Sequence, residues 1–320
     1  MIYQISIVIP VFNEEESLLE LTQWISRVMN AHGFSYEVIL VNDGSTDRSW
    51  DVVQELSQRN SNIKGLNFTR NYGKSAALDA GFKRAQGEVV ITMDADLQDS
   101  PDEIPDLYKM IKDGLDVVSG WKKERHDPIS KTIPSKFFNG VTRWISGIQL
   151  HDFNCGLKAY RNKVVKNITI YGEMHRYIPL LAKWSGFPKI GEKVVQHRAR
   201  KYGYSKFGLE RFLNGFLDLI TVSFVHKYKK KPMHFFGLLG TLSFMTGFLI
   251  TLWLIFNKIY SMNKGLKVRE IVDQPLFFLA LVALIIGVQL FVTGFIAELM
   301  TSSQSKEAEY KIDEEINFDF

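Results

Sequence analysis

The 320-residue sequence predicts an α/β protein in which a doubly wound, mostly parallel sheet is followed by an interfacial helix and two transmembrane helices. Two observations predict this class. Up to about residue 94, short apolar blocks alternate with amphipathic stretches, which is typical of strands and helices that follow one another in a parallel sheet. Near the C-terminus, two uncharged runs each have the length of about 20 residues that a membrane-spanning helix needs.

The sheet is predicted from four strand-like segments separated by helical ones. The predicted strands are residues 5–12, 36–43, 63–68 and 88–94. The predicted helices are residues 14–31, a helix through residues 50–56 with Ser45 or Thr46 as its cap, and residues 74–86. Strands in apolar blocks between helices indicate a sheet that is covered on both faces.

Polar residues fall at the carboxyl ends of three predicted strands: Asn13, Asp43 and Asp94. In open α/β sheets, ligands bind beyond these ends, so we expect the functional site at this edge. No GxGxxG follows the first strand, and no GxxxxGK[ST] occurs in the chain. These absences argue against a dinucleotide dehydrogenase and a P-loop nucleotidase.

The fourth strand runs into an acidic cluster, ITMDADLQDS, at residues 91–100. Asp94 and Asp96 stand two residues apart on an extended strand end, so their carboxylates point the same way, with Gln98 one step further. Hard oxygen ligands of this kind suit Mg²⁺ or Mn²⁺, and the lack of a nearby His/Cys set argues against zinc. An Asp-x-Asp pair is also common on ordinary surfaces, but here it ends a buried strand.

Residues 235–256 and 275–297 contain no charged side chain and predict two membrane spans. The alternative is a pair of buried helices in a soluble protein. Four lysines of the stretch HKYKKKPMH precede the first span, which favours the cytoplasmic side for that end. Residues 208–226 have apolar residues at helical spacing, and we interpret them as an interfacial helix, with a core helix as the alternative.

These patterns divide the chain into residues 1–207, 208–234, 235–300 and an acidic tail, 301–320. The single cysteine, Cys155, excludes an intrachain disulfide and fits a reducing compartment. Because the tail is acidic, the rest of the chain is more basic than the formal net charge of +4. A basic body suits anionic lipid or a phosphorylated substrate, and we expect no nucleic acid partner. We predict a multi-pass protein of the inner or plasma membrane with the α/β domain on the cytoplasmic face.

Four segments, SIVIPVFNEE, VNDGSTD, RNYGKSAAL and DADLQDSPDEIP, resemble in order and spacing the family 2 glycosyltransferases of the GT-A fold. The later stretches SGWKKERHDP, HDFNCGLKAYR, YGEMHRYIP and RARKYGYSKF, followed by two spans, resemble the polyprenyl-phosphate type, which includes dolichol-phosphate mannose synthase and undecaprenyl-phosphate sugar transferases. The resemblance implies transfer of a hexose-type sugar from a UDP- or GDP-sugar to a polyprenyl phosphate, for cell-envelope glycan or glycoconjugate assembly. It also suggests a homo-oligomer.

The resemblance implies which residues hold the donor. The nucleotide and its phosphates would contact Pro10, Phe12, Glu14, Asp43, Gly73, Lys74 and Asp94. The metal-and-diphosphate motif would be Asp94, Asp96 and Gln98, with Asp96 as direct ligand of Mg²⁺ or Mn²⁺ and Asp94 orienting the ribose or a metal-bound water. A turn with a helix cap is the alternative for Asp43, and a solvated side chain is the alternative for Lys74.

The resemblance also implies a diphosphate-closing loop and an acceptor site. The loop would use Arg200 and Lys206, whereas Arg198 and Lys201 are equally compatible with attraction to anionic lipid. The acceptor phosphate would contact Arg125, Lys131, Ser135, His175 and Arg176. Lys131 stands where relatives often carry Arg, and His175 is also compatible with a structural role. Asp152 matches a general base or acceptor organiser.

Two other functions remain open on the sequence. One is a processive membrane polysaccharide synthase, but Gly140 stands where its Q/R-x-x-R-W motif begins, before Arg143 and Trp144, and only two spans are predicted. The other is an inactive membrane scaffold or lipid-binding relative, against which the intact acidic motif argues. The sequence leaves the sugar, the nucleotide base and the lipid chain length open.

Overall fold

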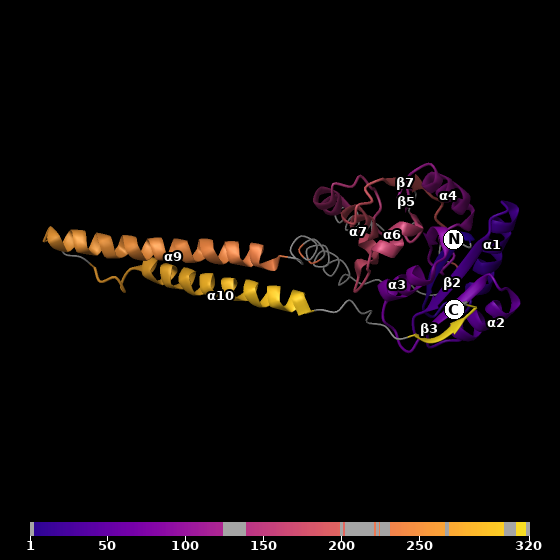
Figure 1. The fold of residues 1–320 in the computed structure, drawn as a ribbon, viewed down its shortest axis with the longest axis horizontal. Coiled ribbons are helices and arrows are strands. Elements are labelled where there is room, and N and C mark those ends of the chain that lie inside the picture. Colours follow the sequence, from indigo (N-terminus) through magenta and orange to yellow (C-terminus); the bar gives the residue numbers. More distant parts are fainter. Residues whose placement is uncertain are drawn as a thin grey trace. The chain divides into compact units, whose positions relative to one another are not determined.

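The computed structural model describes residues 3–123, 139–198, 201, 221, 224, 231–265, 269–303 and 312–317. The chain divides into two compact units. The first comprises Met1–Ile220 with Ala308–Phe320, and the second comprises Thr221–Glu307. The sheet and most helices belong to the first unit, and a helical hairpin makes up the second (Figure 1).

Within the described residues, the first unit is built on one sheet in the order β7-β5-β6-β4-β1-β2-β3-β8. Its strands are β1 (Tyr3–Val11), β2 (Tyr36–Asn42), β3 (Ile63–Phe68), β4 (Gly87–Thr92), β5 (Val117–Trp121), β6 (Lys158–Arg161), β7 (Ile190–Val194) and β8 (Ile312–Ile316). The pairs β1–β2, β1–β4, β2–β3 and β5–β7 are parallel. The strands β6 and β8 pair antiparallel with their neighbours.

The four predicted strands are confirmed as β1 to β4, which form the parallel centre of the sheet. Their near-continuous apolar sequences are explained by burial on both faces, since Ile5, Ile7, Val8 and Ile9 of β1 are all fully buried. The predicted α/β class with a doubly wound, mostly parallel sheet is therefore confirmed. The antiparallel strand β6, which inserts between β4 and β5, was not predicted.

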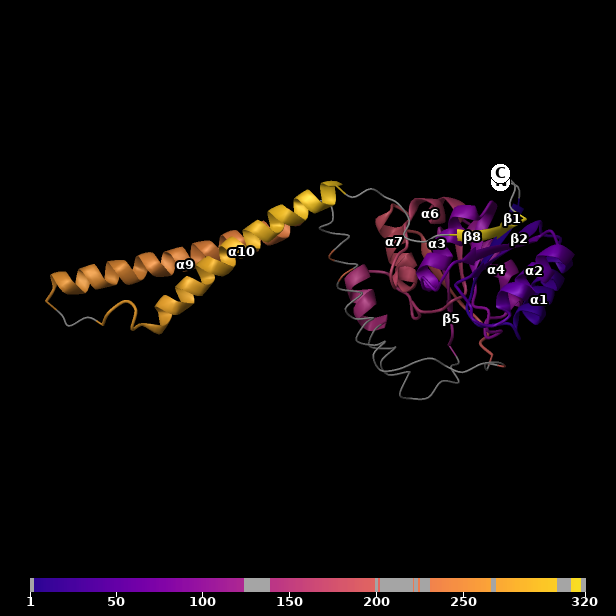
Figure 2. The same cartoon turned by 90° about the horizontal axis from the view of Figure 1, so that it is seen from below.

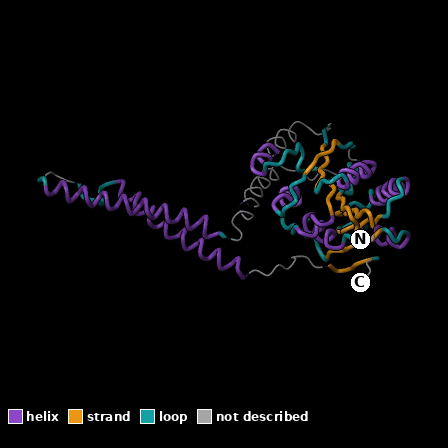
Figure 3. The backbone as a smooth tube through the Cα atoms, turned by 45° about the horizontal axis from the view of Figure 1, so that its top comes forward, coloured by secondary structure: helices purple, strands orange, loops and turns teal. Residues whose placement is uncertain are grey.

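Helices cover both faces of this sheet. They are α1 (Leu18–Ala31), α2 (Ser49–Arg59), α3 (Lys74–Arg84), α4 (Ile104–Lys112), α6 (Asn162–Asn167) and α7 (Ile178–Trp184). Apolar residues of α1, α2 and α4 join one core cluster with the odd-numbered side chains of β1. The helix α3 packs on the other face, where Gly81 lies against Val8. Figure 2 shows α1 and α2 on one side of the sheet and α3, α6 and α7 on the other, and Figure 3 shows the strands between helices.

The predicted capping of the second helix is wrong. This helix, α2, begins at Ser49. The side chain of its N-cap residue, Arg48, makes no capping hydrogen bond, and Asp47 Oδ1 accepts the N–H of Ser49 at 2.9 Å. The expected caps are used elsewhere, because Thr46 N donates to Asn13 Oδ1 at 2.8 Å and Asn13 N donates to Ser45 Oγ at 3.0 Å. Both residues therefore join the loops after β1 and β2 rather than start the helix.

The acidic tail contributes an edge strand that the sequence did not reveal. Residues Ile312–Ile316 form β8 and pair antiparallel with β3, as the strand beside β3 in Figure 1 shows. The Asn317 side chain donates from Nδ2 to the carbonyls of Ser57 and Ile63 at 2.9 and 3.0 Å. A tail that covers β3 protects an edge which would otherwise present unpaired backbone groups.

The second unit contains two long apolar helices, α9 (Pro232–Asn263) and α10 (Pro275–Ser303). Both are long and apolar enough to cross a membrane, with mean hydropathies of 1.9 and 2.7 over the candidate spans. Only 17% and 11% of these windows are buried, whereas a core helix of a soluble protein would be mostly buried. The predicted interfacial helix, 208–226, lies outside the described residues except for residues 221 and 224.

Glycines allow the two apolar helices to touch through their backbones. A Cβ atom on Gly240 would lie 2.7 Å from the carbonyl oxygen of Gly287, and one on Gly247 would lie 2.6 Å from that of Ala280. Close approach at small residues is the usual way in which helices pack in a bilayer, where apolar burial between helices gives no net gain. The packing of the hairpin is therefore of the kind expected in a membrane.

Candidate active site

The loops after the central strands are joined by a chain of amide and hydroxyl groups. Asn42 Nδ2 donates to Asn67 Oδ1 at 2.8 Å, and Ser45 Oγ donates to Asn42 Oδ1 at 2.5 Å. Asn13 continues the chain through Ser45 and takes a left-handed backbone conformation with φ of 55°. Because Asn tolerates this conformation better than most residues, it suits the sharp turn at the end of β1. The strand ends thus form a rigid edge.

Asp43 holds the loop that leads into α3. Its Oδ1 accepts the backbone N–H of Tyr72 at 2.7 Å, and its Oδ2 accepts that of Gly73 at 3.0 Å. Burial raises the pKa of Asp43, while these two N–H groups act in the opposite direction. The next residue, Gly44, has φ of 65° and lies so close to Arg70 that a Cβ atom would be 2.3 Å from its carbonyl carbon. The structure therefore shows a loop-organising role for Asp43, and the nucleotide contact stays a prediction.

Asp94 lies two residues beyond β4 and forms an ion pair with Lys74, the first residue of α3. Burial alone would raise the pKa of Asp94, but the positive charges of Lys74 and Lys122 lower it below its usual range. The carboxylate packs on the backbone of Gly156, where a Cβ atom would lie 2.6 Å from Asp94 Oδ2. Asp94 is thus an ionised side chain whose position depends on a glycine from a distant segment.

The acidic loop after Asp94 is tightly constrained. Asp96 is 7% exposed, and its Oδ1 accepts the backbone N–H of Gln98 at 3.2 Å across Leu97, which has an unusual φ of 62°. Gln98 O accepts the N–H of Arg198 at 3.0 Å, which ties this loop to the segment after β7. A non-glycine residue in the left-handed region stores strain, and such strain is common at functional sites.

The third acid of the cluster has a structural partner. Asp99 is fully buried, and its Oδ1 lies 2.9 Å from Lys122 Nζ. Burial tends to lower the pKa of Lys122, but the carboxylate of Asp99 raises it above its usual range. Asp99 is therefore an internal counter-ion, whereas Asp94 and Asp96 remain the candidates for ligand binding.

The oxygen atoms that these side chains offer can hold a hard divalent cation only if a bound ligand fills the remaining coordination positions. Within the described residues, no group of three or more His, Cys, Asp and Glu side chains could hold a metal ion. Asp96 with Gln98, and Asp94 if it leaves Lys74, offer oxygen atoms that Mg²⁺ or Mn²⁺ accepts. The remaining positions would have to come from water and phosphate oxygens, as is usual for cations bound together with a nucleotide substrate.

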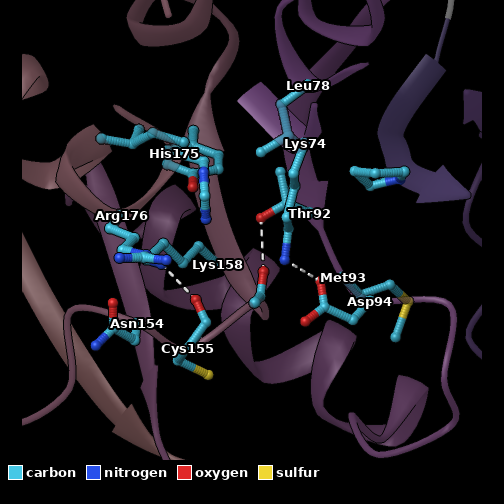
Figure 4. Close-up of a pocket in the computed structure, with 14 residues that line it drawn as sticks. Lys74, Leu78, Thr92, Met93, Asp94, Asn154, Cys155, Lys158, His175 and Arg176 are labelled. Atoms are coloured by element: carbon cyan, nitrogen blue, oxygen red, sulfur yellow. Dashed lines mark hydrogen bonds and ion pairs between the residues drawn. The ribbon is translucent and has the colours of Figure 1, made fainter. Parts of the chain in front are cut away.

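A pocket opens beside Asp94 and brings together five of the predicted site residues. These are Pro10, Lys74, Asp94, His175 and Arg176, which come from four separate segments of the chain. Figure 4 shows Lys74 pointing to Asp94, with His175 and Arg176 across the pocket.

His175 lies beside the start of α3. Its Nδ1 is 3.1 Å from Ser75 Oγ, which also accepts the backbone N–H of His175 at 3.0 Å. Arg176 is 7% exposed, and its guanidinium lies 3.5 Å from Glu173 Oε2. Both side chains are thus positioned at the pocket wall by local contacts.

The pocket also contains a charged residue that sequence reasoning missed. Lys158 on β6 is 3% exposed and donates from Nζ to the carbonyl of Cys155. Burial lowers the pKa of Lys158. Burial likewise raises the pKa of the neighbouring Cys155 thiol to about 12, so this thiol is neutral. In the sequence, Lys158 reads as one polar residue of a short strand, and nothing local shows that it faces a pocket.

Asp152 is buried, at 1% exposure, and is not among the described residues that line this pocket. Its backbone is held at both ends, because its N–H donates to Glu192 Oε1 at 3.1 Å and its carbonyl accepts Ser119 Oγ at 3.2 Å. Asp152 Oδ1 accepts the N–H of Asn154 at 3.0 Å. Glu192 also binds His151, through Nδ1 at 2.7 Å. The sequence did not reveal Glu192 as the anchor of this segment.

Other predicted residues lie outside the pocket lining. Phe12 and Glu14 follow β1, where Glu14 N donates to Ser49 Oγ at 2.9 Å, and Gly73 precedes α3. The remaining predicted contacts fall outside the described residues: Arg125, Lys131, Ser135, Arg200 and Lys206.

The sequence left two roles open for Arg198 and Lys201, namely the loop that closes over the diphosphate or attraction to anionic lipid. In the structure both residues contact α1. The Arg198 guanidinium lies 4.2 Å from the ring centre of Trp24, and Lys201 Nζ lies 2.6 Å from Glu20 Oε2. These contacts hold both side chains against α1. Such a contact between Arg and an aromatic ring contributes about 0.5–1 kcal/mol at an exposed site.

The fold is that of the GT-A class. Glucosyl-3-phosphoglycerate synthase from Mycobacterium tuberculosis has a similar fold. Its complex with uridine diphosphate aligns with a TM-score of 0.54 and 19% identity, covering 70% of this chain and 80% of that one. Its complex with Mn²⁺ and uridine-diphosphate-glucose gives a TM-score of 0.54 and 18% identity, over 70% of this chain and 79% of that one. At these identities the likeness shows the fold alone.

The chain belongs to glycosyl transferase family 2, whose family model matches residues 6–169. It is 36% identical to the dodecaprenyl-phosphate galacturonate synthase of Rhizobium johnstonii, over 95% of this chain and 89% of the relative. It is 37% identical to an undecaprenyl-phosphate 4-deoxy-4-formamido-L-arabinose transferase of Pseudomonas aeruginosa, over 78% of this chain and 73% of the relative. The predicted resemblance to polyprenyl-phosphate glycosyltransferases is confirmed.

Proposed function

We propose that this protein transfers a hexose-type sugar from a nucleotide-sugar to a membrane polyprenyl phosphate. The observation that carries the proposal is the pocket that joins the acidic end of β4 to Lys74, His175 and Arg176. Relatives that align over most of the chain are named for transfer to dodecaprenyl or undecaprenyl phosphate. The product would be a polyprenyl-phosphate sugar for cell-envelope glycan or glycoconjugate assembly.

The donor would lie along the carboxyl ends of the central strands. In this proposal the nucleotide contacts Pro10, Phe12, Glu14 and Asp43, and the diphosphate lies near Gly73 and Lys74, where α3 begins. A helix N-terminus and a lysine both favour an anion. Arg200 and Lys206 would close over the diphosphate. Either UDP or GDP is compatible with this arrangement.

Asp96 and Gln98 would hold a divalent cation, Mg²⁺ or Mn²⁺, with Asp94 near it. When bound, such a cation offsets the negative charge that develops on the leaving nucleoside diphosphate. The ion pair of Asp94 with Lys74 supports Asp96 as the direct ligand, because the Asp94 carboxylate already has a cationic partner. Lys74 would then exchange Asp94 for a phosphate oxygen of the donor.

The acceptor phosphate would lie near Arg125, Lys131, Ser135, His175 and Arg176. One of its oxygens forms a bond to the anomeric carbon while the bond from that carbon to the diphosphate breaks, and the electron pair leaves with the nucleoside diphosphate. A single displacement inverts the anomeric centre. A phosphate monoester has a second pKa of about 6, so it is mostly ionised near neutral pH and needs no strong base. Asp152 would therefore position the acceptor rather than deprotonate it.

Membrane attachment would bring this site to its lipid. The helices α9 and α10 would cross the inner or plasma membrane as a hairpin, with the first unit on the cytoplasmic face. Protomers would pair through this hairpin. An enzyme held at the bilayer meets a lipid substrate at a much higher effective concentration than a soluble one would.

The proposal is tested with the purified full chain in detergent, undecaprenyl phosphate, and a panel of UDP- and GDP-sugars in the presence of Mg²⁺ or Mn²⁺. We expect release of one nucleoside diphosphate and formation of a polyprenyl-phosphate sugar with inverted configuration. Removal of the divalent cation with a chelator should stop the reaction. If the protein released no nucleoside diphosphate from any donor, an inactive membrane scaffold would be the better interpretation.

A further inference from the structure

The Asp94 carboxylate lies against the backbone of Gly156, a residue of the segment that leads into β6. A Cβ atom on Gly156 would lie 2.6 Å from Asp94 Oδ2, 2.7 Å from its Cγ and 2.8 Å from its Oδ1. All three atoms of the carboxylate therefore touch this one residue. The position of the carboxylate thus depends on what holds the backbone around Gly156.

The carbonyls of residues 155–157 each accept a hydrogen bond from a different strand. The first accepts one from Lys158 Nζ on β6, and the second accepts one from Thr92 Oγ1 on β4 at 2.8 Å. Figure 4 draws these two bonds as dashed lines. The third carbonyl accepts the backbone N–H of Gly120 on β5 at 2.9 Å. The segment under Asp94 is therefore tied to three strands, and side chains supply two of the three bonds.

The two side-chain donors form one cross-strand pair. Thr92 and Lys158 face each other in the register of β4 and β6, and directly opposite side chains lie on the same face of a sheet. Both residues are buried, with exposed fractions of 4% and 3%. A hydrogen bond in the interior is stronger than the same bond in water, and no solvent replaces a donor that is removed there.

The bond to the Cys155 carbonyl accounts for a lysine in this buried place. A buried ammonium is unfavourable because the charge has lost its water, and burial lowers the pKa of Lys158. An apolar side chain at position 158 would avoid this cost but could not donate to the carbonyl. The lysine therefore fits a role in holding the segment under Asp94.

We infer that Thr92 and Lys158 are positioning residues, which set the Asp94 carboxylate for the donor by holding the backbone of Cys155 and Gly156. This inference rests on the proposed function, because it assumes that Asp94 acts beside the donor diphosphate. In this role neither residue has to touch a substrate. A looser segment would let Asp94 shift, and a misplacement of about 1 Å is enough to slow an enzymatic reaction strongly.

The test is steady-state transfer by the full-length protein in detergent, with undecaprenyl phosphate and the nucleotide-sugar of the donor panel that gives the highest turnover. Thr92→Val removes the hydroxyl and keeps the shape of the side chain, whereas Thr92→Ser keeps the hydroxyl. We expect Thr92→Val to lower kcat by about tenfold through the misplacement of Asp94, and Thr92→Ser to retain most of the activity. KM for undecaprenyl phosphate should stay the same in both variants.

The second anchor is tested in the same assay. Lys158→Met should lower kcat by about tenfold or more, and Lys158→Arg, which keeps a donor, should restore part of it. Lys166→Met is the matched control, because Lys166 also donates to backbone carbonyls, those of Phe82 and Lys83, but does not line the pocket. It should leave kcat unchanged.

A double-mutant cycle shows whether Thr92 acts through Asp94. Gly156→Ala already displaces the Asp94 carboxylate, so adding Thr92→Val to it should lower kcat by much less than Thr92→Val does alone. Effects that multiply in the double variant would mean that Thr92 acts independently of Asp94, and they would overturn the inference.

The outcomes separate this inference from the proposed function. Unchanged kcat in Thr92→Val overturns the positioning role and leaves the glycosyltransferase intact. A raised KM for undecaprenyl phosphate at unchanged kcat in Lys158→Met would assign Lys158 to the acceptor and also overturn it. Absence of turnover by the unmodified protein with every donor overturns the proposed function as well. If Lys158→Met does not fold, Thr92→Val and Thr92→Ser decide alone.

Discussion

Buried charges lie at both ends of the central strands, and the two groups are organised differently. At the amino ends, Lys64 Nζ is 2.9 Å from Glu37 Oε2, and neither side chain is more than 4% exposed. Glu37 Oε1 also accepts hydrogen bonds from Ser6 Oγ at 2.5 Å and Gln86 N at 2.7 Å. The Glu37 carboxylate is therefore held by an ion pair at one oxygen and by two hydrogen bonds at the other.

At the carboxyl ends, the ion pair of Asp94 with Lys74 keeps a third of each side chain exposed. Both groups line a pocket. An ion pair open to a pocket can exchange its partner for a ligand, whereas a closed pair can only hold the fold together. The comparison predicts that changes at one end act on catalysis and changes at the other act on stability.

The largest effect on activity is expected at the carboxyl ends of the strands, for Asp96→Asn. Removal of this charge should lower kcat by at least about a thousandfold, since stabilisation of the leaving diphosphate would be lost. The unfolding midpoint should hardly change, because an asparagine Oδ1 can still accept the N–H of Gln98. The measurement is steady-state transfer together with chemical unfolding in detergent. Retention of full activity would refute the role of Asp96 in metal and diphosphate binding.

At the amino ends of the strands, Lys64→Met should show the opposite pattern, a loss of stability with little loss of activity. This change leaves the Glu37 carboxylate buried without its counter-ion and should destabilise the catalytic unit by about 3 kcal/mol. Activity per folded molecule should stay close to normal. The control is Lys112→Met, which breaks an exposed ion pair of 2.6 Å with Glu88 and should leave unfolding unchanged. A loss of kcat without a loss of stability would mean that the ion pair at the amino ends also acts on catalysis.

A backbone position sharpens the comparison, because Gly156 lies under the Asp94 carboxylate. The Cβ atom of Gly156→Ala would meet this carboxylate at 2.6 Å and displace it from Lys74. A displacement of this size should lower kcat by about a hundredfold. Gly140→Ala is the matched control, since a Cβ atom there meets nothing within 4 Å. If both variants were equally active, the position of Asp94 would not matter for the reaction.

The same contrast explains what the sequence could and could not predict. The central strands follow from apolar blocks, and Asp94 and Asp96 follow from their place at the end of β4, because both signals are local. Lys158 faces the pocket only because β6 inserts antiparallel between β4 and β5, and no local pattern encodes this pairing. The hydrogen bond from Asp152 N to Glu192 likewise joins residues that are 40 positions apart, which no local pattern encodes.

The acidic tail was another element that local patterns could not place. Its strand, β8, is short and rich in acidic residues, and it finds its partner only when β3 offers a free edge. Strands that depend on a distant edge are decided by the tertiary fold rather than by propensity. The predicted division at residue 301 separates this strand from the sheet that it joins in the structure.

The smallest effect is expected at that edge, for Asn317→Ala. The Asn317 amide donates to two carbonyls, and its backbone has φ of 62°, which asparagine and glycine accept more readily than alanine. Loss of these bonds should destabilise the pairing of β8 by about 1 kcal/mol and leave transfer unchanged. Hydrogen exchange of the Gly65 and Ile316 amides measures this pairing directly, since these residues face one another across the two strands. Asn317→Gly removes the same hydrogen bonds without the backbone strain, so the difference between the two variants isolates the strain. Protection that is unchanged in both variants would show that β8 is held by its backbone ladder alone.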